Sequence, residues 1–187
     1  MLILQLGIFI KVAVLKNLLI GLLAVVAIVV SIAFRQGGSF TVERHITIRT
    51  TPARIQPLIV DLHQWRQWAP WEHIDPNLQR TYSGAASGPG AVYAWRGAHR
   101  AGVARVEITG AAPNRIDLTM AFMKPVASAS QASFTFTPDG AATRVTWRLQ
   151  GPLTLRTRLI TSFIGMDVLL GSELERGLAS LKTAAEK

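Results

Sequence analysis

The sequence "MDVLLGSELERGLASLK", residues 166–182, repeats its apolar residues at helical spacing. Met166, Leu170, Leu174, Leu178 and Leu181 recur every three or four positions, which places them on one side of an α-helix, away from the charged residues. Asp167 lies in the first turn, where the helix dipole favours a negative charge. The chain is therefore predicted to end in a long amphipathic helix, which needs an apolar surface to pack against.

A β-sheet before this helix is predicted to supply that surface. Residues 78–150 alternate apolar and polar side chains, the two-residue period of a strand, with turn residues such as Asp139-Gly140 between the runs. The apolar side chains share one face, whereas the other face carries mostly Thr, Arg, Ser and Asp, as in an antiparallel sheet with one buried face. The expected strands are 40–50, 78–84, 91–97, 102–110, 115–123, 131–138 and 142–150.

A short helical stretch is predicted between the first two strands. Thr51 is a candidate N-cap, followed by Pro52 at the first helical position. Pro57 removes a backbone hydrogen bond, so the helix should be short or kinked. The order of elements is that of an α+β helix-grip fold, in which a curved antiparallel sheet of about seven strands wraps around the final helix.

The N-terminal residues 18–34, "LLIGLLAVVAIVVSIAF", are apolar except for Ser31. A membrane span needs about 20 apolar residues, and a start at Val12, with Lys16 reaching toward the headgroups, supplies them. Apolar residues occupy all faces of this predicted helix, whereas a helix buried in a soluble core typically has apolar residues along one face only. We predict a single-pass anchor at residues 12–34 and two parts of the chain, an anchor with linker at 1–36 and a domain at 37–187.

Cleavage and orientation of this segment stay open. "SIA", residues 31–33, resembles a signal-peptidase site and would allow cleavage after Ala33, but the long apolar start differs from a short charged n-region. Basic residues flank both sides of the span and do not decide its orientation. The usual N-in insertion of such anchors favours a bacterial cytoplasmic membrane protein whose domain lies on the outer, periplasmic face.

The charge and the lack of cysteine limit the functional classes. From Arg35 onward the chain has 18 basic and 11 acidic residues, a net charge of +7, but no basic run or nucleic-acid motif. Nucleic acid is therefore not an expected partner, and attraction to anionic lipid headgroups is a simpler use of the charge. The absence of cysteine excludes disulfides and fits either side of the membrane.

The stretch "DLHQWRQWAPWEHIDP", residues 61–76, concentrates three tryptophans beside two histidines and several carboxylates. His63 and His73 match no metal-ligand spacing, so no metal site is predicted. Tryptophan suits a corner that buries the ring and hydrogen-bonds the indole N–H, which favours a structural plug. In the alternative interpretation, Trp65 or Trp68 borders the mouth of a cavity.

Residues 151–166, "GPLTLRTRLITSFIGM", form a cationic amphipathic segment. Leu155, Leu159 and Phe163 recur at helical spacing, with Arg158 on another face. Packing on the domain itself is the simpler interpretation. The alternative is a membrane contact or cavity lid at about 153–164, which would give a tethered domain a route for lipid entry.

Several of these stretches together resemble the START-like superfamily, in particular its bacterial polyketide cyclase/dehydrase and lipid-transport-like members. They are "FTVERHITI", "TTPARIQPLIVDLHQWRQWAPW", "DPNLQRTYSG", "GPGAVYAWRG", "TRVTWRLQG" and "MDVLLGSELERGLASLK", spanning most of residues 39–186. The resemblance implies a cavity between sheet and final helix that suits a hydrophobic ligand. It implies no particular reaction, because family members include both carriers and cyclases.

We therefore expect a membrane-anchored domain that binds a hydrophobic small molecule or lipid and needs no cofactor. The alternative is a cyclase- or dehydratase-like enzyme acting in the same cavity. Its catalytic residues are unknown, although Tyr82, Tyr93 or Arg96 could do acid–base work, since no carboxylate or histidine clearly faces inward. The predicted ligand-binding residues, each of which could instead be ordinary core, are Tyr93, Trp95, Met120, Phe122, Phe134, Phe136, Trp147, Leu170 and Leu174.

Overall fold

The computed structural model describes residues 2–35, 37–98, 101–124, 127–154, 157–158, 161 and 165–187. The chain divides into two compact units: residues 1–38 with 153–164, and residues 39–152 with 165–187. Part of the predicted amphipathic segment 151–166, including its apolar residues Leu155, Leu159 and Phe163, lies outside the described residues. Its membrane and lid interpretations stay predictions.

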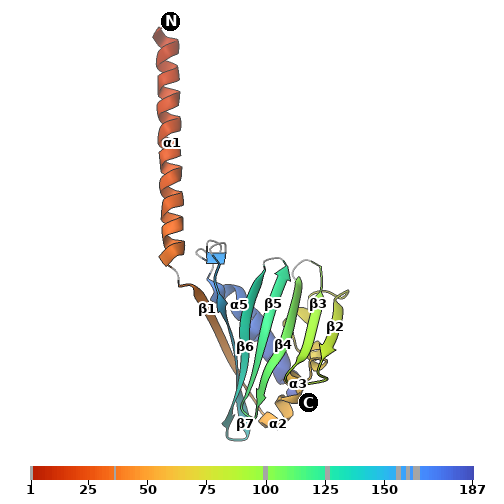
Figure 1. Ribbon diagram of the computed structural model, residues 1–187. Coiled ribbons are helices and arrows are strands. Elements are labelled where there is room, and N and C mark those ends of the chain that lie inside the picture. Colours follow the sequence, from red (N-terminus) through yellow and green to blue (C-terminus); the bar gives the residue numbers. More distant parts are fainter. Residues whose placement is uncertain are drawn as a thin grey trace. The chain divides into compact units, whose positions relative to one another are not determined.

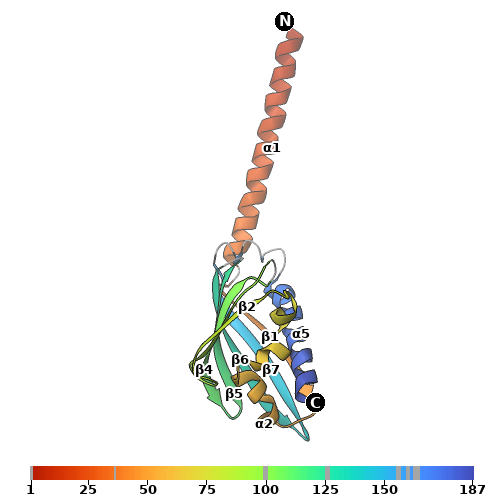
Figure 2. The same cartoon turned by 90° about the vertical axis from the view of Figure 1, so that its right-hand side faces the viewer.

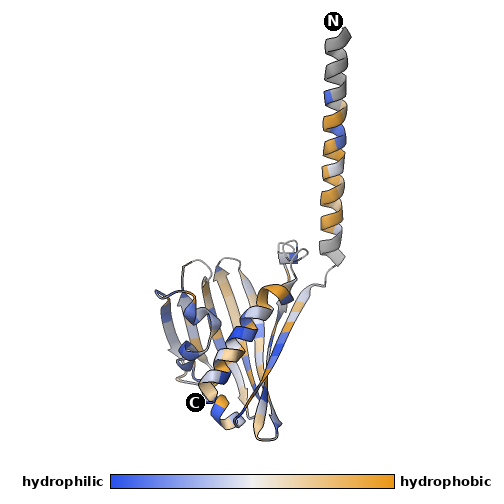
Figure 3. Ribbon diagram, turned by 180° about the vertical axis from the view of Figure 1, so that it is seen from behind, coloured by the Kyte–Doolittle hydropathy of each residue, from blue (hydrophilic) through white to orange (hydrophobic). Residues whose placement is uncertain are grey.

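Helix α1 (Leu2–Arg35) is the main element of the first unit. Its stretch Ala13–Ser31 has a mean hydropathy of 2.6, long and apolar enough to cross a membrane, and none of it is buried. In Figure 3 this stretch is coloured mostly hydrophobic. An anchor and an export signal share these properties, so both interpretations of the segment remain.

The second unit contains a seven-stranded antiparallel sheet, as predicted (Figure 1). The strand order is β1-β7-β6-β5-β4-β3-β2, a meander closed by pairing of the first strand with the last. Alternation of buried and exposed residues follows each central strand, which confirms one buried face. The strands are β1 (Ser39–Ile48), β2 (Gln79–Gly84), β3 (Ala91–Arg96), β4 (Val103–Ala112), β5 (Arg115–Lys124), β6 (Ser128–Asp139) and β7 (Ala142–Pro152).

Helix α5 (Met166–Ala185) covers the buried face of this sheet, and Figure 2 shows it in a separate layer from the strands. Leu174, Leu178 and Leu181 are buried against the core, as the helical spacing predicts. Near the end of α5, Lys182 Nζ donates a hydrogen bond to the Thr47 carbonyl oxygen at 2.9 Å, which ties this end of the helix to β1. The α+β helix-grip fold predicted from the sequence is confirmed.

Four short helices connect β1 to β2. They are α2 (Pro52–Ile55), α3 (Pro57–Val60) and the 3₁₀ helices η1 (Gln64–Gln67) and η2 (Pro70–His73). Pro57 starts a new helix instead of continuing the first, as its missing N–H predicts. Thr51 occupies the N-cap position and Pro52 follows it, as predicted, although the Thr51 side chain makes no capping hydrogen bond. The short helices lie over the sheet beside α5 (Figure 2).

Candidate ligand pocket

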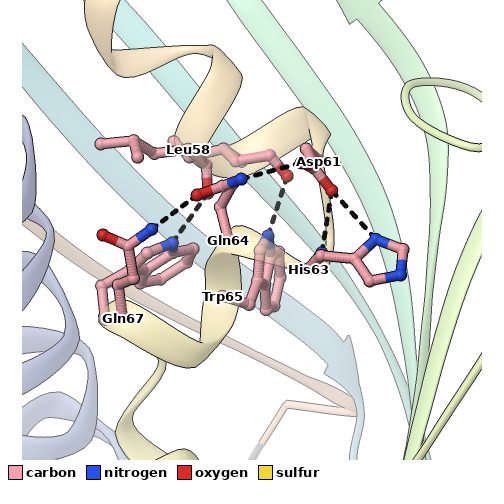
Figure 4. A network of polar contacts seen from close by, with 8 residues as sticks. Leu58, Asp61, His63, Gln64, Trp65 and Gln67 are labelled. Atoms are coloured by element: carbon pink, nitrogen blue, oxygen red, sulfur yellow. Dashed lines mark hydrogen bonds and ion pairs between the residues drawn. The ribbon is translucent and has the colours of Figure 1, made fainter.

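The tryptophans at the helical corner mostly form core. Trp65 and Trp68 are at most 1% exposed, and their Nε1 atoms donate to the carbonyl oxygens of Ile59 and Leu58, each at 2.8 Å (Figure 4). Asp61 accepts hydrogen bonds from the backbone N–H of His63 and the side chain of Gln64, which fixes the turn before η1. These bonds satisfy both buried indole groups, so Trp65 and Trp68 close this end of the domain.

Aromatic rings fill the space beneath the middle of α5. Phe134 and Trp147 stack with ring centroids 4.9 Å apart, and Trp68 meets Trp147 edge-on at 5.8 Å. At Gly177 the helix lies so close that an added Cβ would be 2.7 Å from Trp147 Cζ3. No hydrophobic ligand fits between helix and sheet at this point.

A pocket of about 140 Å³ opens along the same interface, closer to the start of α5. Its walls are apolar and come from β5, β7, η2 and α5, and Glu173 is its one charged lining residue. The lining residues are Pro70, Trp71, Ile74, Met120, Phe122, Trp147, Leu149, Leu170, Glu173 and Leu174.

The burial of the walls shows which way the pocket opens. Along β5, Met120 is 3% exposed and Phe122 is only partly buried; along α5, Leu174 is 3% exposed and Leu170 partly buried. Both walls therefore become more exposed toward the end of β5 and the start of α5. Ser39 pairs with Pro152 at that end, so β1 begins there and β7 ends there. We call this the entry end of the domain.

Of the nine predicted ligand-binding residues, five line this pocket: Met120, Phe122, Trp147, Leu170 and Leu174. The other four are at most 2% exposed and belong to the packed core: Tyr93, Trp95, Phe134 and Phe136. Trp71 also lines the pocket but was not among the predicted residues; it follows Pro70 in η2 and stacks on Trp95 with ring centroids 4.4 Å apart. Trp71, and neither Trp65 nor Trp68, is the corner tryptophan that lines the pocket.

A buried carboxylate contradicts the expectation that none clearly faces inward. The Glu72 side chain is 1% exposed and pairs with Arg80, whose Nη2 lies 2.7 Å from Glu72 Oε2. Tyr93 donates a hydrogen bond to the other carboxylate oxygen. Burial and this bond to Glu72 raise the pKa of Tyr93 well above its ordinary value. The group ties η2 to β2 and β3, but neither Glu72 nor the predicted acid–base residues Tyr82, Tyr93 and Arg96 line the pocket.

A second ionic group fastens the start of α5 to β1. Arg44 Nη1 and Nη2 donate to the two carboxylate oxygens of Asp167 at 2.7 and 2.8 Å, and Nε donates to Glu175 at 2.6 Å. The hydrogen bonds from Arg44 hold the pKa of Asp167 below its ordinary value. The guanidinium lies against Gly171, where an added Cβ would overlap it. We call this group the Arg44 clamp.

A larger hollow of about 350 Å³ lies on the opposite, outer face of the sheet. Polar side chains line it, including Arg115, Asp117 and Arg148, which already form ion pairs on that face. It is a solvated groove between long side chains and lacks the apolar walls of a hydrophobic-ligand site. Among the described residues, no group of three His, Asp or Glu side chains could hold a metal ion.

A curved sheet gripping a helix over a small apolar pocket defines a helix-grip domain, and sequence comparison assigns it to a family. Residues 39–186 match the family described as polyketide cyclase / dehydrase and lipid transport, and the chain belongs to it. Comparison with curated proteins gives no significant match.

Solved structures share the fold at low identity. A protein from Rhizobium leguminosarum is 17% identical, with 79% of this chain and 95% of that chain covered and a TM-score of 0.59. Protein CV1439 from Chromobacterium violaceum is 13% identical, with 79% and 97% covered and a TM-score of 0.57. DynU16, from the dynemicin biosynthetic locus, is 17% identical, with 79% and 47% covered and a TM-score of 0.52. The first two proteins are covered over almost their whole length, so each consists almost entirely of the shared fold.

Proposed function

We propose that this protein binds a hydrophobic small molecule or lipid between the sheet and α5 while α1 anchors it in a membrane. The observation that carries the proposal is the apolar pocket lined by Met120, Phe122 and Leu170. Its walls can give a ligand apolar contact, and burial of apolar surface is worth about 25 cal/mol per Å². The family description, which includes lipid transport, supports the same class of ligand.

The size of the pocket limits what enters it. Drug-sized ligands occupy about 300–1,000 Å³, and an apolar cavity of about 150 Å³ holds one benzene ring. At about 140 Å³, the pocket takes one ring or a short length of acyl chain. The rest of a larger ligand would extend through the mouth, or the pocket would have to widen.

Widening would come from the start of α5. The described residues of its first turn, from Met166 to Leu170, are exposed or only partly buried, whereas its later turns bury Leu178 and Leu181. The Arg44 clamp opposes movement of this turn through surface ion pairs, which are each worth about 0–1 kcal/mol. Ligand entry is therefore proposed to displace the first turns of α5 while the later turns stay packed.

A polar group on the ligand would meet three lining residues. Trp71 Nε1 and Trp147 Nε1 are buried and have no hydrogen-bond partner among the described residues, so an oxygen acceptor that bonds to either of them would satisfy an unpaired donor. Glu173, paired with Arg176 at the wall, would accept from a hydroxyl or amine. The favoured ligand has an apolar end and one hydrogen-bonding group.

Native mass spectrometry of residues 37–187, purified from cells without added lipid, tests this proposal. A hydrophobic co-purifying mass is expected with the native sequence and should be lost with Leu170→Trp, which fills the mouth. Leu170 is only partly buried, so this change should leave the unfolding free energy within about 0.5 kcal/mol. An empty protein that also takes up no fluorescent fatty acid would contradict the proposal.

Cyclase- or dehydratase-like turnover is the second candidate, and Glu173 is the observation that favours it. This is the one carboxylate among the pocket-lining residues, and a general acid or base must reach the substrate. Glu173→Gln should abolish turnover of a polyketide-like substrate if the protein is an enzyme. If it is a carrier, the same variant should retain bound ligand and change its affinity only slightly.

A further inference from the structure

Outside α1, the exposed large apolar side chains of the described residues gather around the pocket. They are Ile74, Met123, Val168 and Leu169, with exposed fractions of 39%, 50%, 68% and 42%. Ile74 itself lines the pocket, Met123 follows the lining residue Phe122, and the other two precede Leu170. Elsewhere among the described residues of the domain such side chains are buried or partly buried. We call this set the apolar rim.

Two unpaired cations lie beside this rim. Arg96 and Lys124 are exposed at the ends of β3 and β5, and Val103 pairs with both across the sheet, so they share one row at the entry end. No ion pair of either is found among the described residues. The carboxylates nearest the start of α5 and β1 are paired: Glu43 with Arg148, and Asp167 with Arg44, which also pairs with Glu175. The entry end therefore combines apolar side chains with free positive charge.

A short stretch of chain connects α1 to the first residue of β1. Residues 36–38 separate the last residue of α1, Arg35, from Ser39, where β1 begins at the entry end. Four residue steps span at most about 14 Å of extended chain. If α1 crosses a bilayer, Ser39 therefore stays within that distance of the end of α1.

We infer that the apolar rim, with Arg96 and Lys124, docks on the surface of an anionic lipid bilayer and turns the pocket mouth toward it. Side chains such as Met123 and Leu169 insert at the headgroup boundary, and the cations attract anionic lipid. Docking does not depend on whether the pocket is occupied. Loading of the pocket directly from the bilayer rests on the proposed binding function and narrows the ligand to a membrane lipid or a molecule dissolved among lipids.

The full chain in vesicles allows a direct test, because it has no cysteine of its own. Single cysteines replacing Met123 or Leu169 would carry an environment-sensitive fluorophore, and Ala141→Cys in the β6–β7 turn would be the matched control. Ala141 is exposed and lies at the far end of β7, whose 11 residues separate it from the entry end. Nitroxide-labelled lipid and aqueous iodide would serve as the two quenchers.

Docking predicts that lipid nitroxide quenches the reporters at 123 and 169 at least about threefold more than the reporter at 141, with iodide showing the reverse order. Lipid quenching at 123 should decrease when Val168→Asp is added, or when Arg96→Glu and Lys124→Glu are added together. It should also decrease in vesicles that contain phosphatidylcholine but no phosphatidylglycerol, because these vesicles carry no anionic lipid. Equal lipid quenching at all three positions, or strong iodide quenching at 123 and 169, would overturn the inference.

A separate measurement distinguishes this inference from the proposed function. Fatty-acid uptake by the detergent-solubilised full chain reports the pocket alone. Lipid quenching at the rim without fatty-acid uptake would support docking and contradict ligand binding in the pocket. Fatty-acid uptake without lipid quenching at the rim would support ligand binding and contradict docking. The reporter at 123 could instead be quenched only by a second labelled copy of the chain. That result would show that the rim contacts another copy of the protein and not the bilayer, and it would contradict the inference.

Discussion

The two halves of the interface between α5 and the sheet use the same elements with opposite results. Under the middle of the helix, Gly177 lets α5 approach Trp147, and stacked aromatic rings leave no space. Nearer its start, Leu170 and Leu174 face Met120 and Phe122 across a pocket of about 140 Å³. The middle of the helix is therefore packed against the sheet, whereas its start borders the pocket in which we propose that a ligand binds. Variants in the first region should affect folding, and variants in the second should affect binding.

The largest effect is expected in the packed half. Trp68→Ala removes a fully buried ring that contacts Phe134 and Trp147 and donates to the Leu58 carbonyl oxygen. It should lower the free energy of unfolding of residues 37–187 by about 3–5 kcal/mol, measured by guanidinium denaturation. Met123→Ala at the exposed rim should change it by less than about 0.5 kcal/mol. A similar loss from both variants would remove the distinction between the two regions.

The close approach at Gly177 should produce the next largest effect. Gly177→Ala would place a Cβ 2.7 Å from Trp147 Cζ3 and 2.9 Å from Pro70 Cγ, neither of which is the end of a flexible chain. Overpacking of about 1–3 kcal/mol should exceed the gain in helix propensity of about 1 kcal/mol. Gly171→Ala is the matched control, because the flexible Arg44 side chain can yield there. A stabilised Gly177→Ala variant in thermal unfolding would contradict this account of the interface.

Release of the Arg44 clamp should act mainly on binding. Arg44→Gln removes the hydrogen bonds to Asp167 and Glu175 and should change the unfolding free energy little, since these partners are solvent-exposed. Fatty-acid uptake, followed by stopped-flow fluorescence, should become a few-fold faster because the first turn of α5 moves more easily. Slower or unchanged uptake would show that the start of α5 does not gate the pocket. Arg115→Gln on the outer face is the control.

The smallest effect is a pH dependence of the same step. Because hydrogen bonds from Arg44 lower the pKa of Asp167 in the folded protein, the stabilising contribution of this contact is fully present above the ordinary aspartate pKa of about 3.9. It is lost as the pH falls through the lower folded-state pKa. Uptake should therefore accelerate slightly below about pH 4. The Arg44→Gln variant should lack this acceleration, and an equal acceleration in both proteins would assign it to other carboxylates.

Hydrophobic periodicity was sufficient to predict the fold and the inward face of the sheet. It could not separate Phe134 and Phe136 from Met120 and Phe122, because all four alternate inward along their strands. The distance between α5 and the sheet decides which of them line a pocket, and that distance depends on the three-dimensional approach at Gly177. A glycine on the apolar side of the final helix was the available signal.

Two charged groups were missed for different reasons. Arg44 stands on the apolar face of β1, between Val42 and Ile46, and this break in the alternation was readable from the sequence. Glu72 turns inward because it lies in a short 3₁₀ helix, for which two- and 3.6-residue periods give no guidance. The exposed apolar rim at Met123 and Val168 could not be predicted from the sequence. Hydrophobic periodicity does not show which apolar side chains remain exposed in the folded protein.

Quenching of tryptophan fluorescence by a brominated fatty acid tests the ligand site most directly. Trp71 and Trp147 line the pocket, whereas Trp65 is buried in the helical corner and hydrogen-bonded to Ile59. We predict saturable quenching of the tryptophan fluorescence of residues 37–187. The quenching should be weaker in Trp71→Phe and Trp147→Phe and should persist in Trp65→Phe. No saturable quenching, or quenching lost only in Trp65→Phe, would contradict a ligand site between the sheet and the start of α5.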